Sequence, residues 1–194
     1  MSKRFLILAN PIAGGGRARQ RALQLQQELE RLGCAAEVCF SKAAGDLRRR
    51  AAEVDPVDFD AIVSVGGDGT LNEVLNGLPD PTLPLCPMGM GTANVLSKEL
   101  GLPRQPEQLA GILAGGRTLS AAIGLCNKQR FLLFASAGMD ASIVQRLDQL
   151  RTGTLGKLGW ARPILHTLWR WPLGRFTVRV GDRELADVTS AVVT

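Results

Sequence analysis

One glycine-rich loop with a single acid is the stretch of this sequence best suited to chemistry. Gly66, Gly67 and Gly69 carry no side chains where the backbone turns, and glycine adopts conformations that other residues avoid. Asp68 is the one charge in the loop, and the hydroxyl of Thr70 predicts a cap for a following helix. Converging amide donors, an open approach and an acid that can orient a metal ion or a hydroxyl suit a nucleotide phosphate. The alternative is a plain tight turn from strand to helix.

A strand and a helix must position this loop. Residues 61–65 are apolar and largely β-branched, which predicts a parallel strand buried on both faces, and a helix is predicted over residues 70–76. Residues 5–9 predict another buried strand, and residues 10–16 form a second glycine loop directly after it. That second loop matches neither the Walker pattern nor G-x-G-x-x-G, so it is a weak signal by itself.

A third glycine loop occupies residues 88–94, after a short extended segment at residues 83–87. The prolines of that segment are typical of a sheet edge or a strand end. Strands and helices alternate up to about residue 118, which predicts an α/β fold with a parallel, Rossmann-like sheet. Three glycine loops that each follow a strand are then expected to meet at the carboxyl edge of the sheet, where open α/β folds bind ligands.

The pattern changes in the last third of the chain. Strands are predicted over residues 119–125 and 130–137, and a hairpin with a two-residue turn over residues 176–185. We therefore predict a nucleotide-binding domain at residues 1–118, followed by the first and incomplete part of a β-rich domain at residues 119–194.

Composition limits the kinds of partner. The chain has 194 residues, of which 45% are apolar, so a sizeable core is available. No apolar run approaches the roughly 20 residues that span a bilayer, and the first residues do not read as a secretory leader. The net charge of +5 favours anionic partners, while 5% aromatic residues and no tyrosine argue against a nucleic-acid platform. The cysteines are expected to be reduced core residues of a cytosolic protein: Cys34, Cys39, Cys86 and Cys126.

Three segments together resemble the diacylglycerol kinase catalytic-domain family, which includes bacterial lipid kinases and the sphingosine and ceramide kinases. They are Asn10-Pro11 with Gly14 to Gly16, Gly66 to Val74, and Met90 to Asn94 followed by Leu100-Gly101-Leu102-Pro103. The Gly-Gly-Asp-Gly-Thr motif is also shared with NAD kinases, whereas Gly-Thr-Ala-Asn followed by Leu-Gly-Leu-Pro points to the lipid kinases. The segment from Phe134 to Asp140 resembles the opening of the second domain of that family.

The resemblance implies an NAD kinase/diacylglycerol kinase-like fold, with ATP and Mg²⁺ as cofactors and Asp68 as the acid required for phosphoryl transfer. Val95 stands where many members of the family carry an aspartate. Glu73 either completes the polar network or caps the helix that follows the loop, and the metal ligands are not assigned. The residues that the resemblance places against ATP are Asn10, Pro11, Ile12, Ala13, Gly14, Ser41, Gly66, Gly67, Asp68, Gly69, Thr70, Leu71, Asn72 and Thr92.

The function that the resemblance implies is an ATP-dependent lipid kinase acting on the hydroxyl of diacylglycerol or a similar lipid. The alternatives are an NAD kinase-like enzyme and a non-catalytic nucleotide- or lipid-binding regulator. In the family the general base and the structural Mg²⁺ site lie in a later, acidic region, so both are expected beyond Thr194. The chain is accordingly predicted to be an inactive fragment by itself.

Cytoplasmic localisation is expected, with peripheral contact at the inner membrane face. The tryptophans and arginines of residues 160–175 suit an anionic membrane surface, and the favoured alternative is a helix packed on the second domain's sheet. His166 reads as a core or surface residue rather than as part of a catalytic triad, and Asp140 as a helix cap. The sequence does not predict the oligomeric state.

Overall fold

The computed structural model describes residues 2–138, 141, 142, 145 and 174–194. It divides into two compact units, Met1–Leu132 and Leu133–Thr194. The functional division predicted at residue 118 stays a prediction.

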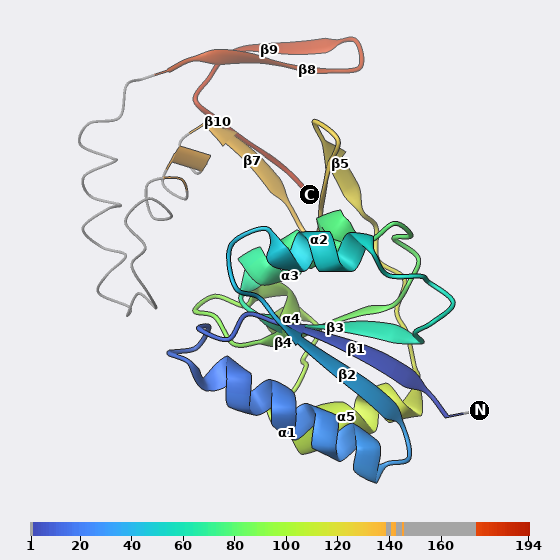
Figure 1. The fold of residues 1–194 in the computed structure, drawn as a ribbon. Helices are drawn as coiled ribbons and strands as arrows, with labels where there is room; N and C mark the ends of the chain where they lie inside the picture. Colours follow the sequence, from blue (N-terminus) through green and yellow to red (C-terminus); the bar gives the residue numbers. More distant parts are fainter. Residues whose placement is uncertain (1, 139–140, 143–144, 146–173) are drawn as a thin grey trace. The chain divides into compact units, whose positions relative to one another are not determined.

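A four-stranded parallel sheet forms the centre of the first unit, in the order β2-β1-β3-β4 (Figure 1). The Rossmann-like α/β expectation is thereby confirmed. Apart from Ser64 in β3, the two inner strands are apolar on both faces, and both are buried along nearly their whole length, as is usual in parallel sheets. The strands are β1 (Arg4–Ala9), β2 (Ala35–Phe40), β3 (Ala61–Gly66) and β4 (Leu85–Gly89).

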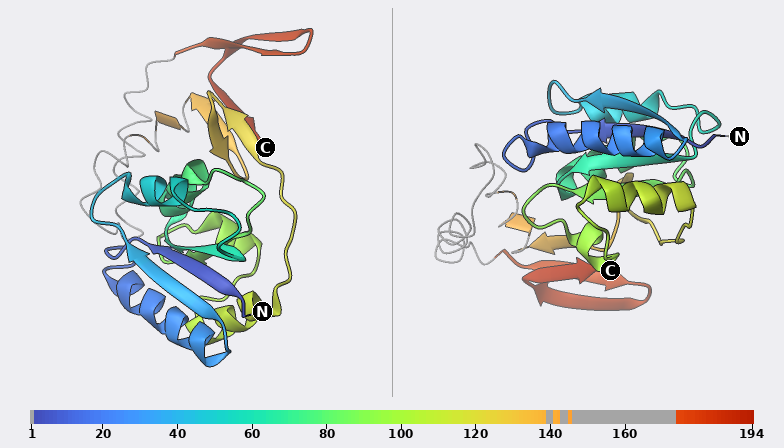
Figure 2. Two further views of the ribbon diagram at one scale, coloured as in Figure 1. Left: turned by 45° about the vertical axis from the view of Figure 1, so that its right-hand side comes forward. Right: turned by 90° about the horizontal axis from the view of Figure 1, so that it is seen from below.

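Helices cover both faces of this sheet (Figures 1 and 2). On one face lie α1 (Arg17–Arg31) and α5 (Pro106–Gly115), which also pack against each other. On the other face lie α2 (Asp46–Ala52) and α3 (Asp68–Gly77). A short helix, α4 (Val95–Glu99), follows the third glycine loop.

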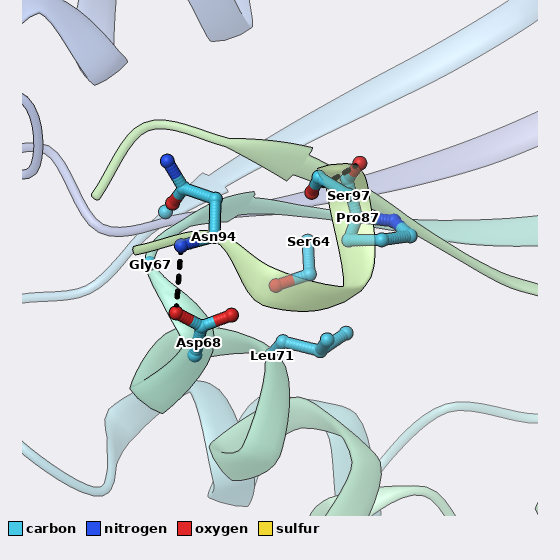
Figure 3. A pocket seen from close by; sticks show the side chains of 8 residues that line it. Ser64, Gly67, Asp68, Leu71, Pro87, Asn94 and Ser97 are labelled. Atoms are coloured by element: carbon cyan, nitrogen blue, oxygen red, sulfur yellow. Dashed lines mark hydrogen bonds between the residues drawn. The ribbon is translucent and has the colours of Figure 1, made fainter. Parts of the chain in front are cut away.

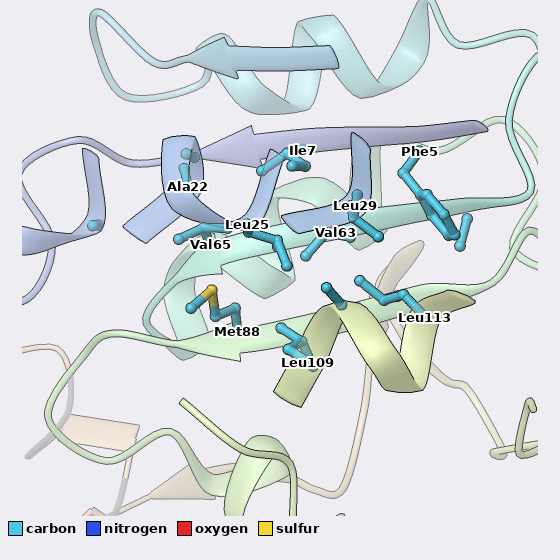
Figure 4. Packing of buried hydrophobic residues seen from close by; sticks show 14 residues of the cluster. Phe5, Ile7, Ala22, Leu25, Leu29, Val63, Val65, Met88, Leu109 and Leu113 are labelled. Carbon is cyan, nitrogen blue, oxygen red and sulfur yellow. The ribbon is translucent and has the colours of Figure 1, made fainter. Parts of the chain in front are cut away.

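The core consists of two apolar layers, one on each face of the sheet, because successive strand residues point to opposite faces. Ile7 and Val63 face α1 and α5 and pack with Leu25, Leu29 and Leu109 (Figure 4). The residues next to them along the strands, such as Leu6, Leu8 and Ile62, face α2 and α3. Burying each such side chain contributes about 1.5–3 kcal/mol, so these layers hold the loops at the sheet edge in fixed positions.

The proline at position 87 lies in an edge strand, in agreement with the sequence prediction. The Ile62 N–H donates to the Pro84 carbonyl at 2.8 Å, and the Met90 N–H donates to the Gly66 carbonyl at 2.6 Å. In this register the even-numbered residues of β4 exchange hydrogen bonds with β3, so the backbone of Pro87 faces away from β3. Proline has no N–H to donate, and this position requires none.

Beyond α5 the strands are shorter than predicted. β5 (Gly124–Cys126) and β6 (Gln129–Phe131) form a hairpin through Asn127 and Lys128, whose φ values of 48° and 66° match a type I′ turn. The prediction of a strand from residue 119 is wrong, because residues 119–123 have no partner strand within the described chain.

All four cysteines are free thiols, as expected. The prediction that they are core residues is wrong for Cys126, which is exposed in the β5–β6 hairpin.

In the second unit, β7 (Ala135–Gly138) pairs antiparallel with β10 (Ser190–Val193). The predicted hairpin is confirmed as β8 (Phe176–Val180) and β9 (Arg183–Val188), joined by Gly181 and Asp182. The predictions for Asp140, His166 and most of residues 160–175 lie outside the described residues.

Candidate nucleotide-binding site

The central glycine loop is a direct junction between β3 and α3. Gly66 ends the strand, Gly67 is the N-cap with φ −90° and ψ −175°, and α3 begins at Asp68. The prediction that Thr70 caps this helix is wrong, since the helix begins two residues earlier. Thr70 is instead buried in the first turn, and its side chain would collide with a Cβ at Gly66. Glycine at position 66 therefore allows the helix to start directly at the strand end.

The first turn of α3 presents backbone N–H groups. No side chain caps this end of the helix, and the Leu71 N–H is the first to find a partner within the helix, the Gly67 carbonyl at 3.1 Å. Unpaired N–H groups and the helix dipole together attract anions. A Cβ at Gly69 would meet open space, so the surface over this turn is unobstructed.

The three glycine loops meet at the carboxyl edge of the sheet, as expected. Gly14 of the first loop lies so close to the third that a Cβ there would be 2.8 Å from the Met90 carbonyl oxygen. Gly67 and Gly91 pack backbone against backbone, and a Cβ at Gly91 would be 2.7 Å from the Gly67 Cα. The close approach of these loops depends on the absence of side chains at the three glycines.

The ends of β1 and β2 bring two further predicted residues to this edge. The Asn10 N–H donates to the Val65 carbonyl at 2.9 Å, and the Ser41 N–H donates to the Ala9 carbonyl at 3.0 Å. Asn10 also accepts the Ile12 N–H on its side-chain Oδ1 at 3.3 Å, which shapes the first loop as an Asx turn.

Two charged side chains shape these two loops from outside. Arg17 donates from Nε to the Gly14 carbonyl at 2.8 Å. Asp46 accepts the Lys42 and Ala43 N–H groups on Oδ2, both at 2.8 Å, and these bonds lower the pKa of the Asp46 carboxyl below its ordinary value. The loop after Ser41 is therefore held by an ionised carboxylate at neutral pH.

Asp68 joins the second glycine loop to the third (Figure 3). Its Oδ2 accepts the Asn94 N–H at 2.8 Å and its Oδ1 accepts the Val95 N–H at 2.7 Å, at the start of α4. Asp68 itself is exposed, so its carboxylate is anchored on one side and open on the other. A carboxylate has about four lone-pair sites, which leaves each oxygen able to accept one further contact.

Asn94 is a buried residue of the site, and the sequence analysis assigns it no role of its own. Its backbone has φ 48° and its side chain closes the loop on itself. Oδ1 accepts the Gly91 N–H and Nδ2 donates to the Gly91 carbonyl, both at 2.7 Å. Asparagine tolerates this left-handed conformation better than most residues, and that preference was the available signal.

Glu73 caps a helix, but not its own. Its Oε1 accepts the Leu47 N–H at 3.0 Å and the Arg48 N–H at 3.3 Å, in the first turn of α2. The expectation that Glu73 caps the helix after the glycine loop is therefore wrong, because its carboxylate caps α2 and fixes α2 against α3.

The remaining predicted residues differ in accessibility. Ile12 is 76% exposed, and Thr92 and Asn72 are exposed, whereas Gly14, Thr70 and Leu71 are buried. A ligand at this edge would therefore meet backbone from the buried residues and side chains from the exposed ones.

A small pocket opens between the second and third loops (Figure 3). Its cavity volume is about 10 Å³, whereas pockets for drug-sized ligands measure roughly 300–1,000 Å³. A nucleotide would thus lie over the glycine loops rather than inside this pocket. The lining residues are Ser64, Gly66, Gly67, Asp68, Leu71, Pro87, Asn94 and Ser97.

Metal-binding capacity at the edge depends on Asp68. No cluster of three or more histidine, cysteine, aspartate or glutamate side chains that could hold a metal occurs among the described residues. Mg²⁺ is commonly held by one or two carboxylates together with substrate phosphates and water, and the free lone pairs of Asp68 fit one such contact.

A family model, the diacylglycerol kinase catalytic domain, matches residues 4–126. The chain belongs to the diacylglycerol kinase catalytic domain family. The match covers the sheet, all three glycine loops and β5, and it confirms the resemblance seen in the sequence.

Curated members of this family are similar over much of the chain. A diacylglycerol kinase of Bacillus subtilis (strain 168) is 32% identical over 163 residues, which are 81% of this chain and 53% of that protein. A diacylglycerol kinase of Staphylococcus carnosus (strain TM300) is 28% identical over 142 residues, which are 71% of this chain and 46% of that protein. The chain spans about half the length of these relatives.

A solved structure of a diacylglycerol kinase from Bacillus anthracis str. Sterne is similar in fold, with a TM-score of 0.70 and 25% identity. The similarity covers 98% of this chain and 63% of the other. Within the described part of this family member, no helix is both long and apolar enough to cross a membrane.

Proposed function

We propose that this chain forms the nucleotide-binding part of an ATP-dependent lipid kinase, which phosphorylates the hydroxyl of diacylglycerol or a similar lipid. The observation that carries the proposal is the position of Asp68. It is an exposed carboxylate, anchored by two backbone N–H groups, at the place where glycine loops of a matched kinase family meet. Phosphoryl transfer requires positioning and charge neutralisation more than covalent chemistry, and this arrangement offers both.

Each loop has a distinct part in the proposal. The backbone N–H groups of Gly67 to Thr70, at the uncapped start of α3, bind phosphate oxygens. Asn10 to Gly14, Ser41 and Thr92 border the nucleotide from the neighbouring strand ends, and Leu71 and Asn72 border it from α3. When bound, Mg-ATP supplies the transferable phosphoryl group and a metal charge that neutralises it.

Asp68 has the central role. Its free lone pairs accept one contact from Mg²⁺ or from the acceptor hydroxyl, while the Asn94 and Val95 N–H groups hold the carboxylate in one orientation. Val95 contributes only its backbone to this arrangement, so the second acid that many family members carry is not needed to anchor Asp68. We place the general base beyond Thr194.

A lipid acceptor implies work at a membrane surface. We propose that the protein acts from the cytoplasm at the inner face of the membrane as a peripheral protein. The tryptophans and arginines of residues 160–175 are the sequence feature that supports this placement.

The test uses ATP labelled on the γ-phosphate and mixed micelles of diacylglycerol, with separate tubes of sphingosine and of NAD. It compares the product of the complete reading frame with its Asp68→Asn variant, and with Asp58→Asn as a matched exposed aspartate away from the loops. We expect label on diacylglycerol, a loss of at least about 100-fold for Asp68→Asn, as for other preorganised transition-state contacts, and no loss for Asp58→Asn. Label on NAD, or nucleotide binding without any transfer, would refute the lipid kinase.

A further inference from the structure

Ser64 places a hydroxyl inside β3, where the neighbouring residues are apolar. The residue is 2% exposed, and its Oγ is the buried side-chain polar atom that has no hydrogen-bond partner within the described residues. Burying a hydroxyl without a partner is unfavourable, and such atoms in native proteins generally meet ordered water. The position of Ser64 therefore calls for a partner that is not a protein atom.

The Ser64 hydroxyl opens into the small pocket beneath the glycine loops. Figure 3 shows its oxygen turned toward the side of the pocket on which Asp68 lies. The cavity volume of about 10 Å³ is far too small for a nucleotide and is close to the roughly 10–15 Å³ that a single water molecule needs. The occupant that fits the space and the chemistry is an ordered water molecule.

The other polar side chains of the pocket are already engaged. Ser97 donates from Oγ to the Pro87 carbonyl at 3.3 Å, and both ends of the Asn94 amide bind Gly91. Asp68 differs, since each of its oxygens accepts only one backbone N–H and keeps a free lone pair. An internal water needs two to four polar partners, and Ser64 and Asp68 are two that have capacity.

We propose that Ser64 holds an ordered water molecule that donates a hydrogen bond to the Asp68 carboxylate. Ser64 is thereby a positioning residue: it acts on Asp68 through the water and contacts no nucleotide itself. The water site stands on the geometry alone, whereas its importance for phosphoryl transfer rests on the proposed function of Asp68.

The test measures water and backbone amides in the 194-residue chain. A crystal structure that resolves waters is expected to contain one within hydrogen-bond distance of Ser64 Oγ and of an Asp68 oxygen, and Ser64→Ala is expected to lose it. By NMR, the Asn94 and Val95 amides of Ser64→Ala should exchange their hydrogens about two- to tenfold faster, the factor expected for one weakened hydrogen bond. The Leu25 and Leu29 amides of α1 serve as internal references.

Two comparisons isolate the mechanism. Ser97→Ala removes a hydroxyl of the same pocket that already has a partner, and it should leave the water in place. In an Asp68→Asn background, Ser64→Ala should accelerate the two amides less than it does in the unmodified chain. A dry pocket, a metal ion in place of water, or unchanged exchange in Ser64→Ala would each overturn the proposal. None of these readouts requires phosphoryl transfer, so they are independent of the labelled-ATP experiment.

Discussion

The Asn76 side-chain amide and the Arg130 backbone exchange two hydrogen bonds, as neighbouring strands do, although Asn76 lies in α3. Asn76 Oδ1 accepts the Arg130 N–H at 2.7 Å, and Asn76 Nδ2 donates to the Arg130 carbonyl at 2.9 Å. The Arg130 guanidinium then donates to the carbonyls of Leu75 at 3.1 Å and Leu78 at 2.6 Å, at the C-terminal end of α3. Hydrogen bonds therefore join the C-terminal end of α3, the helix that begins at Asp68, to the β5–β6 hairpin.

Breaking this pair should destabilise the first unit. Asn76→Ala removes two side-chain hydrogen bonds to the Arg130 backbone, and we expect the free energy of unfolding to fall by about 1–3 kcal/mol. Urea denaturation followed by circular dichroism measures this change. Gln27→Ala, at an exposed position of α1, is the matched control and should change stability by less than about 0.5 kcal/mol. Equal stability of the two variants would contradict the role given to Asn76.

The Glu73 carboxylate should contribute to stability through α2. Glu73→Ala leaves the Leu47 and Arg48 N–H groups without their partner, and a lost helix cap typically costs about 0.5–2 kcal/mol. Hydrogen exchange should locate the effect, with faster exchange at these two amides and little change in α1. Faster exchange in α3 alone in Glu73→Ala would show that Glu73 stabilises its own helix instead.

Two neighbouring glycines should respond oppositely to alanine. Gly69→Ala places a methyl group in open space within α3, so we expect the fold to gain about 0.5–1 kcal/mol while nucleotide binding weakens. Gly66→Ala drives a methyl group into the Thr70 side chain and should destabilise the fold by about 1–3 kcal/mol. Thermal melts and ATP titration by calorimetry separate the two effects. Unimpaired ATP binding in a stabilised Gly69→Ala variant would argue against phosphate binding over this turn.

Burial of the Cys86 thiol should appear as a pH dependence of stability. Burial raises the pKa of Cys86 to about 12, against an ordinary value near 8.5. Between these values the unfolded chain loses the thiol proton and the folded chain keeps it, so this group lowers the free energy of unfolding as the pH rises. The contribution amounts to about 1.4 kcal/mol per pH unit in that window and is absent below it.

The measurement for Cys86 compares urea denaturation of the unmodified chain and Cys86→Ala between pH 7 and pH 10. The stability of Cys86→Ala should fall less steeply above about pH 8.5, where the free thiol begins to ionise. In the folded protein, a thiol reagent should modify the exposed Cys126 quickly and Cys86 slowly. Parallel pH profiles for the two proteins would show that Cys86 does not titrate as described.

Local patterns in the sequence were sufficient for the parallel sheet and for the meeting of the glycine loops. The strands of residues 5–9 and 61–65 are apolar on both faces, and the carboxyl ends of parallel strands necessarily share one edge. The bonds from Asp68 to α4 and from Glu73 to α2 span 26 or 27 and 25 or 26 residues, respectively. Such bonds depend on how helices dock, which no local pattern encodes.

The start of α3 illustrates the same limit. Thr70 is a good capping residue by type, but the cap position belongs to Gly67 because the strand and helix join without a spacer. Ser64 has no comparable signal in the sequence, where it is one small residue within a strand. Only its burial and its missing hydrogen-bond partner distinguish it.

The contact between Gly67 and Gly91 also limits which amino acids the two loops can carry during evolution. A Cβ on either residue points at the backbone of the other loop, at 3.4 Å or less from the Cα, where no rotamer change can relieve it. Glycine is therefore required at both positions, and each loop limits what the other can carry where they touch. A graft of one loop from a relative should succeed only when that loop keeps glycine at position 67 or 91.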